Sequence, residues 1–241
     1  MAIDCFLLAG RIMMESGAET YRVEDTMLRM ARSQNMSDAQ SYVTPTGIIF
    51  SLGGTHPTRI TSISTRITDL HRIVLVNNVS RKLTSQMITL EQAYDELKKI
   101  QKTNYFLPIA LQVLAASIAS SCFLILFKGM WSDMPAAFIA GGVGLYVVTM
   151  VHGFTRVKFF SEFLAALVVG TIAYFAVQFG YGTEIDKIII GSVMPLVPGL
   201  LITNAVRDLM AGHFIAGIAK GAEAFLTAFA IGSGIALVLA F

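Results

Sequence analysis

The stretch Gly191-Ser-Val-Met-Pro-Leu-Val-Pro-Gly-Leu-Leu-Ile-Thr-Asn-Ala-Val-Arg-Asp208 decides how the rest of the chain is interpreted. It lies in a mostly apolar segment, residues 185–206. A helix of this length can cross a membrane, at about 1.5 Å per residue against ~30 Å of hydrocarbon. Pro195 and Pro198 fall near its middle, and each removes a backbone N–H and clashes with the carbonyl four residues earlier. The pattern therefore predicts a span broken at these two prolines.

Such a break is either a structural kink or part of a binding site. Irregular backbone at membrane depth is tolerated where it is packed in protein or lines a cavity, and interrupted spans build the sites of many transporters. The half-helix that begins near Gly199 would direct its positive N-terminal end at the break, which suits a carboxylate. Thr203 and Asn204 add side-chain hydrogen-bonding groups. The candidate substrate-binding residues are Pro195, Pro198, Gly199, Thr203 and Asn204.

Composition indicates a membrane protein with a water-facing part. Of the 241 residues, 54% are hydrophobic, and the mean hydropathy is +0.65. The first 105 residues hold 22 of the 34 charged residues. We therefore expect a soluble domain at residues 1–105 and a membrane domain at 106–241. The net charge of +2 does not favour a nucleic-acid partner.

The soluble domain is predicted to be small and α+β. Two sequences have the spacing of a capping box, Ser16 with Glu19 and Thr89 with Gln92. Pro45 predicts that the first strand is an edge or bulged strand. The expected elements are helices at 3–14, 17–33, 69–83 and 89–102, and strands at 41–52 and 58–67 separated by a turn at 53–57.

The membrane domain is predicted to be an all-α bundle of five transmembrane helices. Gly141, Gly142 and Gly144 in the second span allow close approach of a neighbouring helix. No acid is expected deep inside a span. The expected spans are residues 107–127, 134–151, 159–179, 185–206 (the broken one) and 221–241.

Basic residues in the short loops predict the orientation, because they concentrate on the cytoplasmic side. The loops after the second and fourth spans are the more basic, with Arg156, Lys158, Arg207 and Lys220 against Lys128 and Lys187 elsewhere. The N-terminal domain is therefore expected in the cytoplasm and the C-terminus outside, in a multi-pass protein of the inner membrane. The first residues lack the basic region of a signal peptide.

Asp208 and Glu223 are candidate coupling or gating residues. Asp208 follows Asn204 by four positions and shares its helix face. Glu223 lies about one turn inside the fifth span, where it either pairs with Lys220 or faces a cavity as a titratable group.

Enzymatic chemistry has little support in the sequence. His56 with Ser51, and Asp69 with His71, form no nucleophile–base constellation, and no phosphate loop is present. The two cysteines, Cys5 and Cys122, give no metal pattern. We expect no enzyme activity, no cofactor and no metal.

Three stretches resemble the threonine/serine exporter family: Glu15-Ser-Gly-Ala-Glu-Thr-Tyr-Arg-Val-Glu24, Val76-Asn-Asn-Val-Ser-Arg81 and Pro195-Leu-Val-Pro-Gly-Leu-Leu-Ile-Thr-Asn-Ala-Val-Arg-Asp-Leu209. The resemblance implies a cytoplasmic domain and ten spans in full-length members, of which this chain looks like the first half. In split members, a short second membrane subunit supplies the other half. The functional positions it implies are Gly17, Glu19, Thr20, Pro195, Pro198, Gly199, Asn204 and Asp208. Glu19 and Thr20 join Asp208 and Glu223 as candidate coupling or gating residues.

The function expected first is a proton-driven exporter subunit for small polar metabolites of the threonine/serine type. It would act in the lipid bilayer with a short second subunit, or as a homo-oligomer. The resemblance also implies a dicarboxylate exporter of the succinate type as an alternative. A membrane-anchored hydrolase and a non-transporting sensor or assembly subunit are the remaining alternatives, and the broken span argues against a simple anchor.

Overall fold

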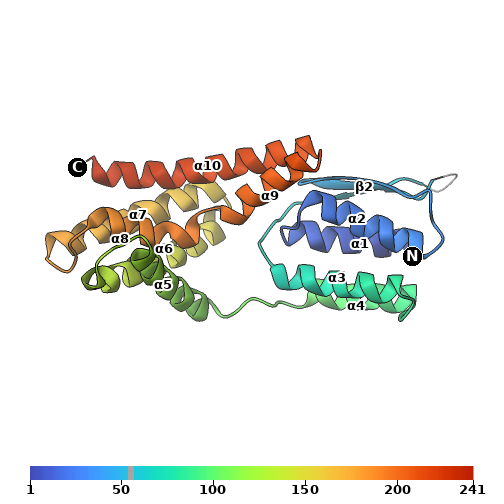
Figure 1. Ribbon diagram of the computed structural model, residues 1–241, viewed down its shortest axis with the longest axis horizontal. Coiled ribbons are helices and arrows are strands. Elements are labelled where there is room, and N and C mark those ends of the chain that lie inside the picture. The colour runs from blue at the N-terminus through green and yellow to red at the C-terminus, as the bar shows by residue number, and fades with distance from the viewer. Residues whose placement is uncertain (54–56, 241) are drawn as a thin grey trace. The chain divides into compact units, whose positions relative to one another are not determined.

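The computed structural model describes residues 1–53 and 57–240. The chain divides into two compact units (Figure 1). The first, here called the N-terminal unit, contains Met1–Tyr105 and Leu200–Ala222, and the second, the membrane unit, contains Phe106–Gly199 and Glu223–Phe241. The expected turn at 53–57 falls partly on residues 54–56, and with His56 that part lies outside the described residues.

Four helices and a sheet build the first 105 residues of the N-terminal unit. Helices α1 and α2 pack on the sheet and on the pair α3 and α4, so the helix pair α1–α2 forms the middle layer (Figure 1). The rings of Phe6 and Phe50 meet edge to face across the core, with centroids 5.9 Å apart. The helices are α1 (Ala2–Glu15), α2 (Thr20–Ser33), α3 (Leu70–Thr84) and α4 (Leu90–Lys102).

The sheet is antiparallel, with strand order β1-β2-β3, and it has one strand more than the sequence predicted. The expected strand at 41–52 is a hairpin of two strands, β1 (Gln40–Thr44) and β2 (Gly47–Ser51), and Pro45 lies in its turn. Proline lacks the N–H that a strand interior needs, so it ends the first strand. β3 (Arg59–Ser62) then pairs with β2.

One of the two predicted capping boxes is confirmed. Thr89 and Gln92 cap α4 reciprocally. The other prediction is wrong: Ser16 closes α1, and α2 begins at Thr20 with Glu19 in the N-cap position and no side-chain cap bond. The reason is Gly17, whose φ of +83° turns the chain sharply between the two helices.

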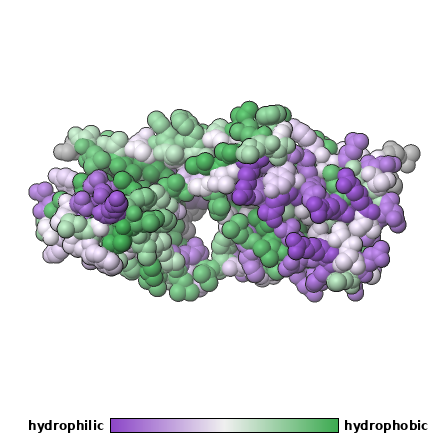
Figure 2. Space-filling model, in the orientation of Figure 1, coloured by the Kyte–Doolittle hydropathy of each residue, from purple (hydrophilic) through white to green (hydrophobic). Residues whose placement is uncertain are grey.

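The membrane unit is built from apolar helices (Figure 2). Its core uses small side chains, among them Ala137, Ala140 and Ala166. The predicted close approach in the second span is confirmed, because Gly141 and Gly142 lie against the hydroxyls of Ser120 and Ser117 on the preceding helix. The helices are α5 (Ile109–Leu126), α6 (Met134–Thr155), α7 (Lys158–Gln178) and α8 (Ile185–Val193), with a short 3-10 turn, η1 (Trp131–Asp133), before α6.

The predicted helix break is present. Helix α8 ends at Val193, and the 3-10 turn η2 (Met194–Leu196) follows. Val197 is extended, with φ −64° and ψ 131°, and α9 (Gly199–Met210) begins after Pro198. The last helix, α10 (Phe214–Leu239), starts seven residues before the predicted span.

Within the described residues, four helices are long and apolar enough to cross a membrane, or five if the broken pair counts as one span. The chain is thus mostly helical, with a small three-stranded sheet. The division at residue 105 remains a prediction, while Leu200–Ala222 groups with the N-terminal residues in the structure.

Candidate functional site

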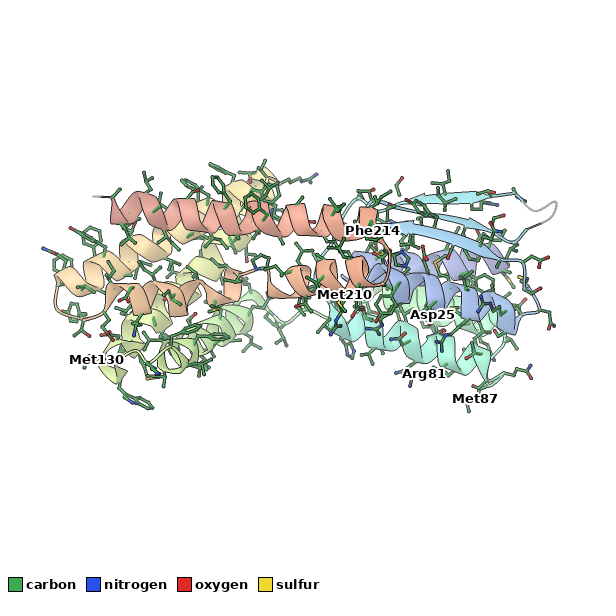
Figure 3. The ribbon with its side chains drawn as sticks, turned by 45° about the horizontal axis from the view of Figure 1, so that its top comes forward. Asp25, Arg81, Met87, Met130, Met210 and Phe214 are labelled. Carbon is green, nitrogen blue, oxygen red and sulfur yellow. The ribbon has the colours of Figure 1, made fainter. Side chains whose placement is uncertain are left out.

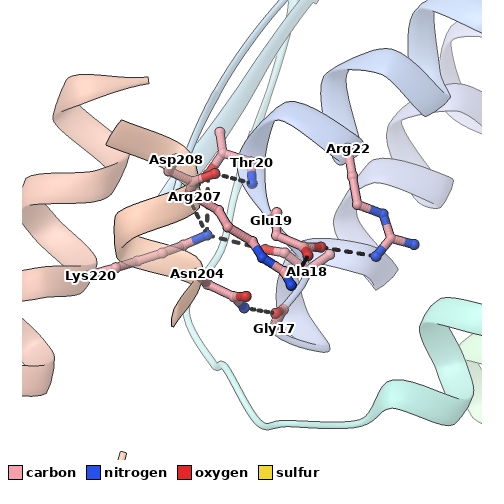
Figure 4. Close-up of polar contacts among 9 residues, drawn as sticks. All are labelled: Gly17, Ala18, Glu19, Thr20, Arg22, Asn204, Arg207, Asp208 and Lys220. Atoms are coloured by element: carbon pink, nitrogen blue, oxygen red, sulfur yellow. Dashed lines mark hydrogen bonds and ion pairs between the residues drawn. The ribbon is translucent and has the colours of Figure 1, made fainter. Parts of the chain in front are cut away.

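A polar cluster in the N-terminal unit joins the start of α2 to α9 and α10. It begins at the turn between α1 and α2, where Gly17 and Ala18 present carbonyl oxygens and Thr20 opens α2. The first N–H groups of a helix have no partner inside it, so this end needs acceptors from elsewhere. Figure 4 shows that Asp208 of α9 supplies the acceptor, while Asn204 of α9 and Lys220 of α10 donate to the carbonyl oxygens of the turn.

Asp208 of α9 caps α2 from a distant part of the chain. Its Oδ1 accepts a hydrogen bond from the backbone N–H of Thr20 at 2.9 Å, and its Oδ2 accepts one from the Thr20 hydroxyl at 2.8 Å. One turn earlier on α9, the side-chain amide of Asn204 donates to the carbonyl of Gly17 at 2.9 Å. The i, i+4 face predicted for Asn204 and Asp208 therefore contacts the α1–α2 turn.

Lys220 of α10 completes this arrangement. Its Nζ lies 2.7 Å from Asp208 Oδ2, 3.2 Å from the Thr20 hydroxyl and 3.1 Å from the carbonyl oxygen of Ala18. Asp208 is fully buried and Lys220 is 4% exposed. An ammonium has three N–H donors, and here each has an acceptor within reach. We call Ala18, Thr20, Asp208 and Lys220 the Asp208 cluster.

Glu19 lies beside this cluster with two arginines. Its carboxylate is bonded to Arg207 of α9 at 2.6 Å and to Arg22 of α2 at 3.0 Å. Burial alone raises the pKa of Glu19, but its own backbone N–H, Arg207 and Arg22 outweigh burial, so the pKa lies below its ordinary value of 4.5. The Glu19 side chain therefore carries a negative charge at neutral pH.

The opposite side of α9 is apolar and exposed. Leu200, Ile202 and Val206 are 45 to 50% exposed, and Met210 and Phe214 mark the corner into α10 (Figure 3). A helix with one polar, contacted side and one exposed, apolar side is amphipathic. Helix α9 thus anchors to the N-terminal residues through its polar side.

The structure brings together four of the nine residues that the sequence singled out. Glu19, Thr20, Asn204 and Asp208 form the cluster and its border. Thr203 lies on the exposed side of α9. The other four belong to the membrane unit: Pro195, Pro198 and Gly199 at the break, and Glu223 in α10.

Glu223 has a partner that the sequence did not suggest. Its Oε1 accepts a hydrogen bond from Lys158 of α7 at 2.8 Å, whereas Lys220 contacts Asp208. Beside this pair lies Glu162, an acid inside α7 that is 7% exposed. The sequence reasoning missed it, although Lys158 and Glu162 are four residues apart on one helix face, which is a detectable signal.

A third buried carboxylate, Asp133, was also missed. It is fully buried and accepts hydrogen bonds from the Thr183 hydroxyl and from the N–H groups of Thr183 and Glu184. These bonds fix the loop before α8 against the end of η1, which is a structural role.

Known proteins resemble this chain over nearly its whole length. A family model described as "Putative threonine/serine exporter" (ThrE) matches residues 4–241. A Klebsiella aerogenes protein named "Probable succinate transporter subunit YjjP" is 24% identical over 99% of this chain and 92% of its own length. The protein of the same name from Escherichia coli is also 24% identical, with the same coverage.

A Mycobacterium tuberculosis protein named "Probable threonine/serine exporter" is 22% identical over 94% of this chain, which corresponds to 44% of that longer protein. No solved structure matches. The family model covers nearly the whole chain, including the α1–α2 turn, the broken span and the Asp208 cluster. The chain belongs to the threonine/serine exporter family of membrane transporters.

Proposed function

We propose that this chain is one subunit of a proton-driven exporter of small carboxylate-bearing metabolites in the inner membrane, and that it acts with a short second membrane subunit. The observation that carries the proposal is the end-to-end match with two relatives that are themselves named transporter subunits. The chain and those relatives correspond over nearly their full lengths, so a shared division of labour between subunits is the simplest expectation.

The substrate site is assigned to the break between α8 and α9. Gly199 begins α9, and a Cβ added to it would meet no atom within 4 Å, so a ligand can approach the backbone there. The N-terminus of a helix carries about half a positive charge and favours a carboxylate. Pro195 and Pro198 keep this end open by preventing a continuous helix.

Two substrates remain candidates. A succinate-type dicarboxylate is favoured by the matching lengths of the two subunits named for succinate. Threonine or serine is favoured by the family description and by the name of the relative from Mycobacterium tuberculosis. This chain spans less than half the length of that relative. Both substrates offer a carboxylate to the same helix end.

The proposal places the N-terminal domain in the cytoplasm. Arg207, near the end of α9, and Lys220, in α10, contact Glu19 and Ala18 at the α1–α2 turn, so this turn lies at the same side of the membrane as the corner between α9 and α10. Basic residues at such a corner favour the cytoplasmic side. With five spans, the C-terminus then lies outside.

Transport in inverted vesicles tests the function. Vesicles that contain this chain and its second subunit should accumulate labelled succinate, or labelled threonine and serine, when a proton gradient is imposed. Vesicles that contain either subunit alone test the non-transporting alternative. If the paired vesicles move none of these solutes, the exporter proposal fails.

The variant Pro195→Ala/Pro198→Ala tests the site. Each proline costs about 3 kcal/mol in a helix interior, so the double variant should be as stable as the parent or more stable. It should bind substrate weakly, because a continuous helix has no N-terminal end at this position. The matched control is Pro135→Ala, at the first turn of α6, where a proline is tolerated. Normal transport by the double variant would show that the break is only a structural kink and not the substrate site.

Cysteine labelling tests the orientation. In a Cys122→Ser background, where the remaining Cys5 is buried, Ser37→Cys should resist an impermeant thiol reagent in intact cells. Tyr181→Cys, in the exposed loop before α8, is the matched control and should react. Labelling of Ser37→Cys in intact cells would show that the N-terminal domain lies outside, opposite to the proposed topology.

A further inference from the structure

Three buried polar atoms of the membrane unit lack a hydrogen-bond partner of normal geometry within the described residues. One is Oγ of Ser120 on α5, and the other two are Oε2 of Glu162 on α7 and Oγ1 of Thr227 on α10. Glu162 is 7% exposed and Thr227 is 1% exposed. Buried polar groups in proteins are normally hydrogen-bonded, so two unsatisfied oxygens in neighbouring helices need an explanation.

The two helices run side by side in the membrane unit (Figure 1). A Cβ built on Gly234 would lie 2.5 Å from the carbonyl oxygen of Phe163, and one built on Gly170 would lie 3.2 Å from Val238. The contacts of α10 therefore advance along α7 in the same direction. Continued towards the start of α7, this register brings Glu223 and Thr227 to the first turns of α7, which contain Lys158 and Glu162.

The four side chains form one cluster, which we call the Glu162 cluster. Lys158 Nζ and Glu223 Oε1 are 2.8 Å apart. Lys158 attracts the Glu162 carboxylate, Glu223 repels it, and the Thr227 hydroxyl lies close enough to act on it as a donor although no bond of normal geometry joins the two. The cluster thus combines two carboxylates, one ammonium and one hydroxyl.

Within these four side chains, one ammonium faces two carboxylates. The four together therefore carry a net charge of −1 when both acids are ionised. A buried carboxylate with an unpaired oxygen is costly, and acids inside membrane spans commonly mark proton pathways. One added proton neutralises the Glu162 carboxylate. The protonated Glu162 then has an O–H group that can donate a hydrogen bond to the Thr227 hydroxyl oxygen.

We propose that Glu162 and Glu223, with Lys158 and Thr227, bind one exchangeable proton and constitute the proton-coupling site of the exporter. This inference rests on the proposed transport function and assigns its proton site. The bound proton resides on Glu162 while Lys158 neutralises Glu223. On release, Glu162 becomes a carboxylate that competes with Glu223 for the same ammonium.

Among the described residues, α6 and α8, which pack on α7, bring no competing buried charge. In α6, His152 of the last turn is exposed, and so is Arg156 just after the helix end. Helix α8 also packs on α7, but its charged residues Asp186 and Lys187 stand at its start, which follows the far end of α7. Among the described charged groups, Lys158 and Glu223 are therefore the ones that face Glu162.

Infrared spectroscopy tests proton binding directly. The full chain, reconstituted with its second subunit in lipid, should show a protonated-carboxyl band that changes with pH. Glu162→Gln should lose that band. Asp186→Asn, which removes an exposed acid of the same unit, and Ser161→Ala, which removes the buried hydroxyl beside Glu162, should keep it. If Glu162→Gln leaves the spectrum unchanged, the proposal is wrong.

Transport separates this proposal from the proposed function. Parent vesicles are first tested for exchange of internal and external substrate without a gradient, which requires transport but no proton coupling. Accumulation driven by a pH gradient is then measured. Glu162→Gln should lose its response to the gradient, while Glu162→Asp should retain part of it. A parent that fails to exchange substrate defeats the proposed function, whereas full gradient-driven accumulation by Glu162→Gln defeats only the coupling site.

Discussion

The Asp208 cluster and the Glu162 cluster both gather charged side chains from separate helices, but they differ in how completely their polar atoms are satisfied. In the first, Asp208 accepts three hydrogen bonds, and Lys220 reaches three acceptors. In the second, Glu162 and Thr227 each hold a buried oxygen without a partner. A satisfied network fixes one conformation, whereas an unsatisfied network can gain a ligand.

The difference also separates two roles that the sequence grouped under coupling or gating. Thr20 and Asp208 hold the start of α2 to α9 and α10, so their bonds are expected to keep the N-terminal unit together. Glu223 belongs to the other cluster, where a change in protonation alters the charge balance. The comparison therefore assigns stability to one cluster and proton binding to the other.

The largest expected effect is on the Asp208 cluster. Asp208→Ala leaves Lys220 buried without its counter-charge and Thr20 without its acceptor, and breaking such a buried pair typically costs about 3–5 kcal/mol. We expect this loss in the free energy of unfolding of the full chain in detergent, measured with denaturant. The sequence suggested a coupling or gating role for Asp208, and its complete burial adds an expected role in folding.

The double variant Asp208→Ala/Lys220→Met is the matched control. It removes both charges, so it should recover a large part of the lost stability, because an apolar replacement of a buried pair is often close to neutral. If Asp208→Ala is as stable as the parent, this cluster does not hold the unit together, and the contrast with the Glu162 cluster disappears.

The next effect compares equivalent substitutions in the two clusters. Asp208→Asn replaces an acceptor of three hydrogen bonds and should lower stability, whereas Glu162→Gln removes the net negative charge of its four side chains and should leave stability level or raise it by about 1 kcal/mol. Thermal unfolding of both variants at neutral pH is the measurement. A larger loss for Glu162→Gln than for Asp208→Asn would reverse the assignment of roles.

Sequence patterns predicted the local features of this fold well. The helix break follows from Pro195 and Pro198, since proline acts on its own backbone and on the turn before it. The capping box at Thr89 is likewise local. The same pattern failed at Ser16, because Gly17 in a left-handed conformation ends α1 and leaves Ser16 in its final turn.

The candidate site was only partly predictable. Thr20 and Asp208 are 188 residues apart, and no spacing rule connects the start of one helix with the side of another at that separation. Thr20 was singled out through the family resemblance alone. The Glu162 cluster could have been predicted in part, because an acid four residues after Lys158 in an apolar helix is a local sequence pattern.

A smaller effect is expected at Asn204. Asn204→Leu removes the hydrogen bond to the Gly17 carbonyl, a loss of about 1 kcal/mol, or more if the carbonyl stays unpaired. The sequence suggested that this residue binds substrate, and the two roles predict different measurements. A structural role lowers thermal stability without substrate, whereas a binding role reduces the thermal shift caused by substrate. Thr203→Val, on the exposed side of the same helix, is the control.

The smallest expected effect is at Glu19, whose partners are partly exposed: Arg207 is 56% exposed and Arg22 is 37% exposed. Ion pairs of this kind contribute less than about 1 kcal/mol.

The pH dependence of stability is nevertheless informative for Glu19. Since the pKa of Glu19 is lower in the folded chain than its ordinary 4.5, its contribution is fully present above that value and is lost as the pH falls through the folded pKa. Glu19→Gln should therefore match the parent below that range and be less stable above it, while Glu15→Gln, which breaks only a pair within α1, serves as the control. A stability difference between Glu19→Gln and the parent that does not change with pH would show that the Glu19 charge does not stabilise the border of the Asp208 cluster.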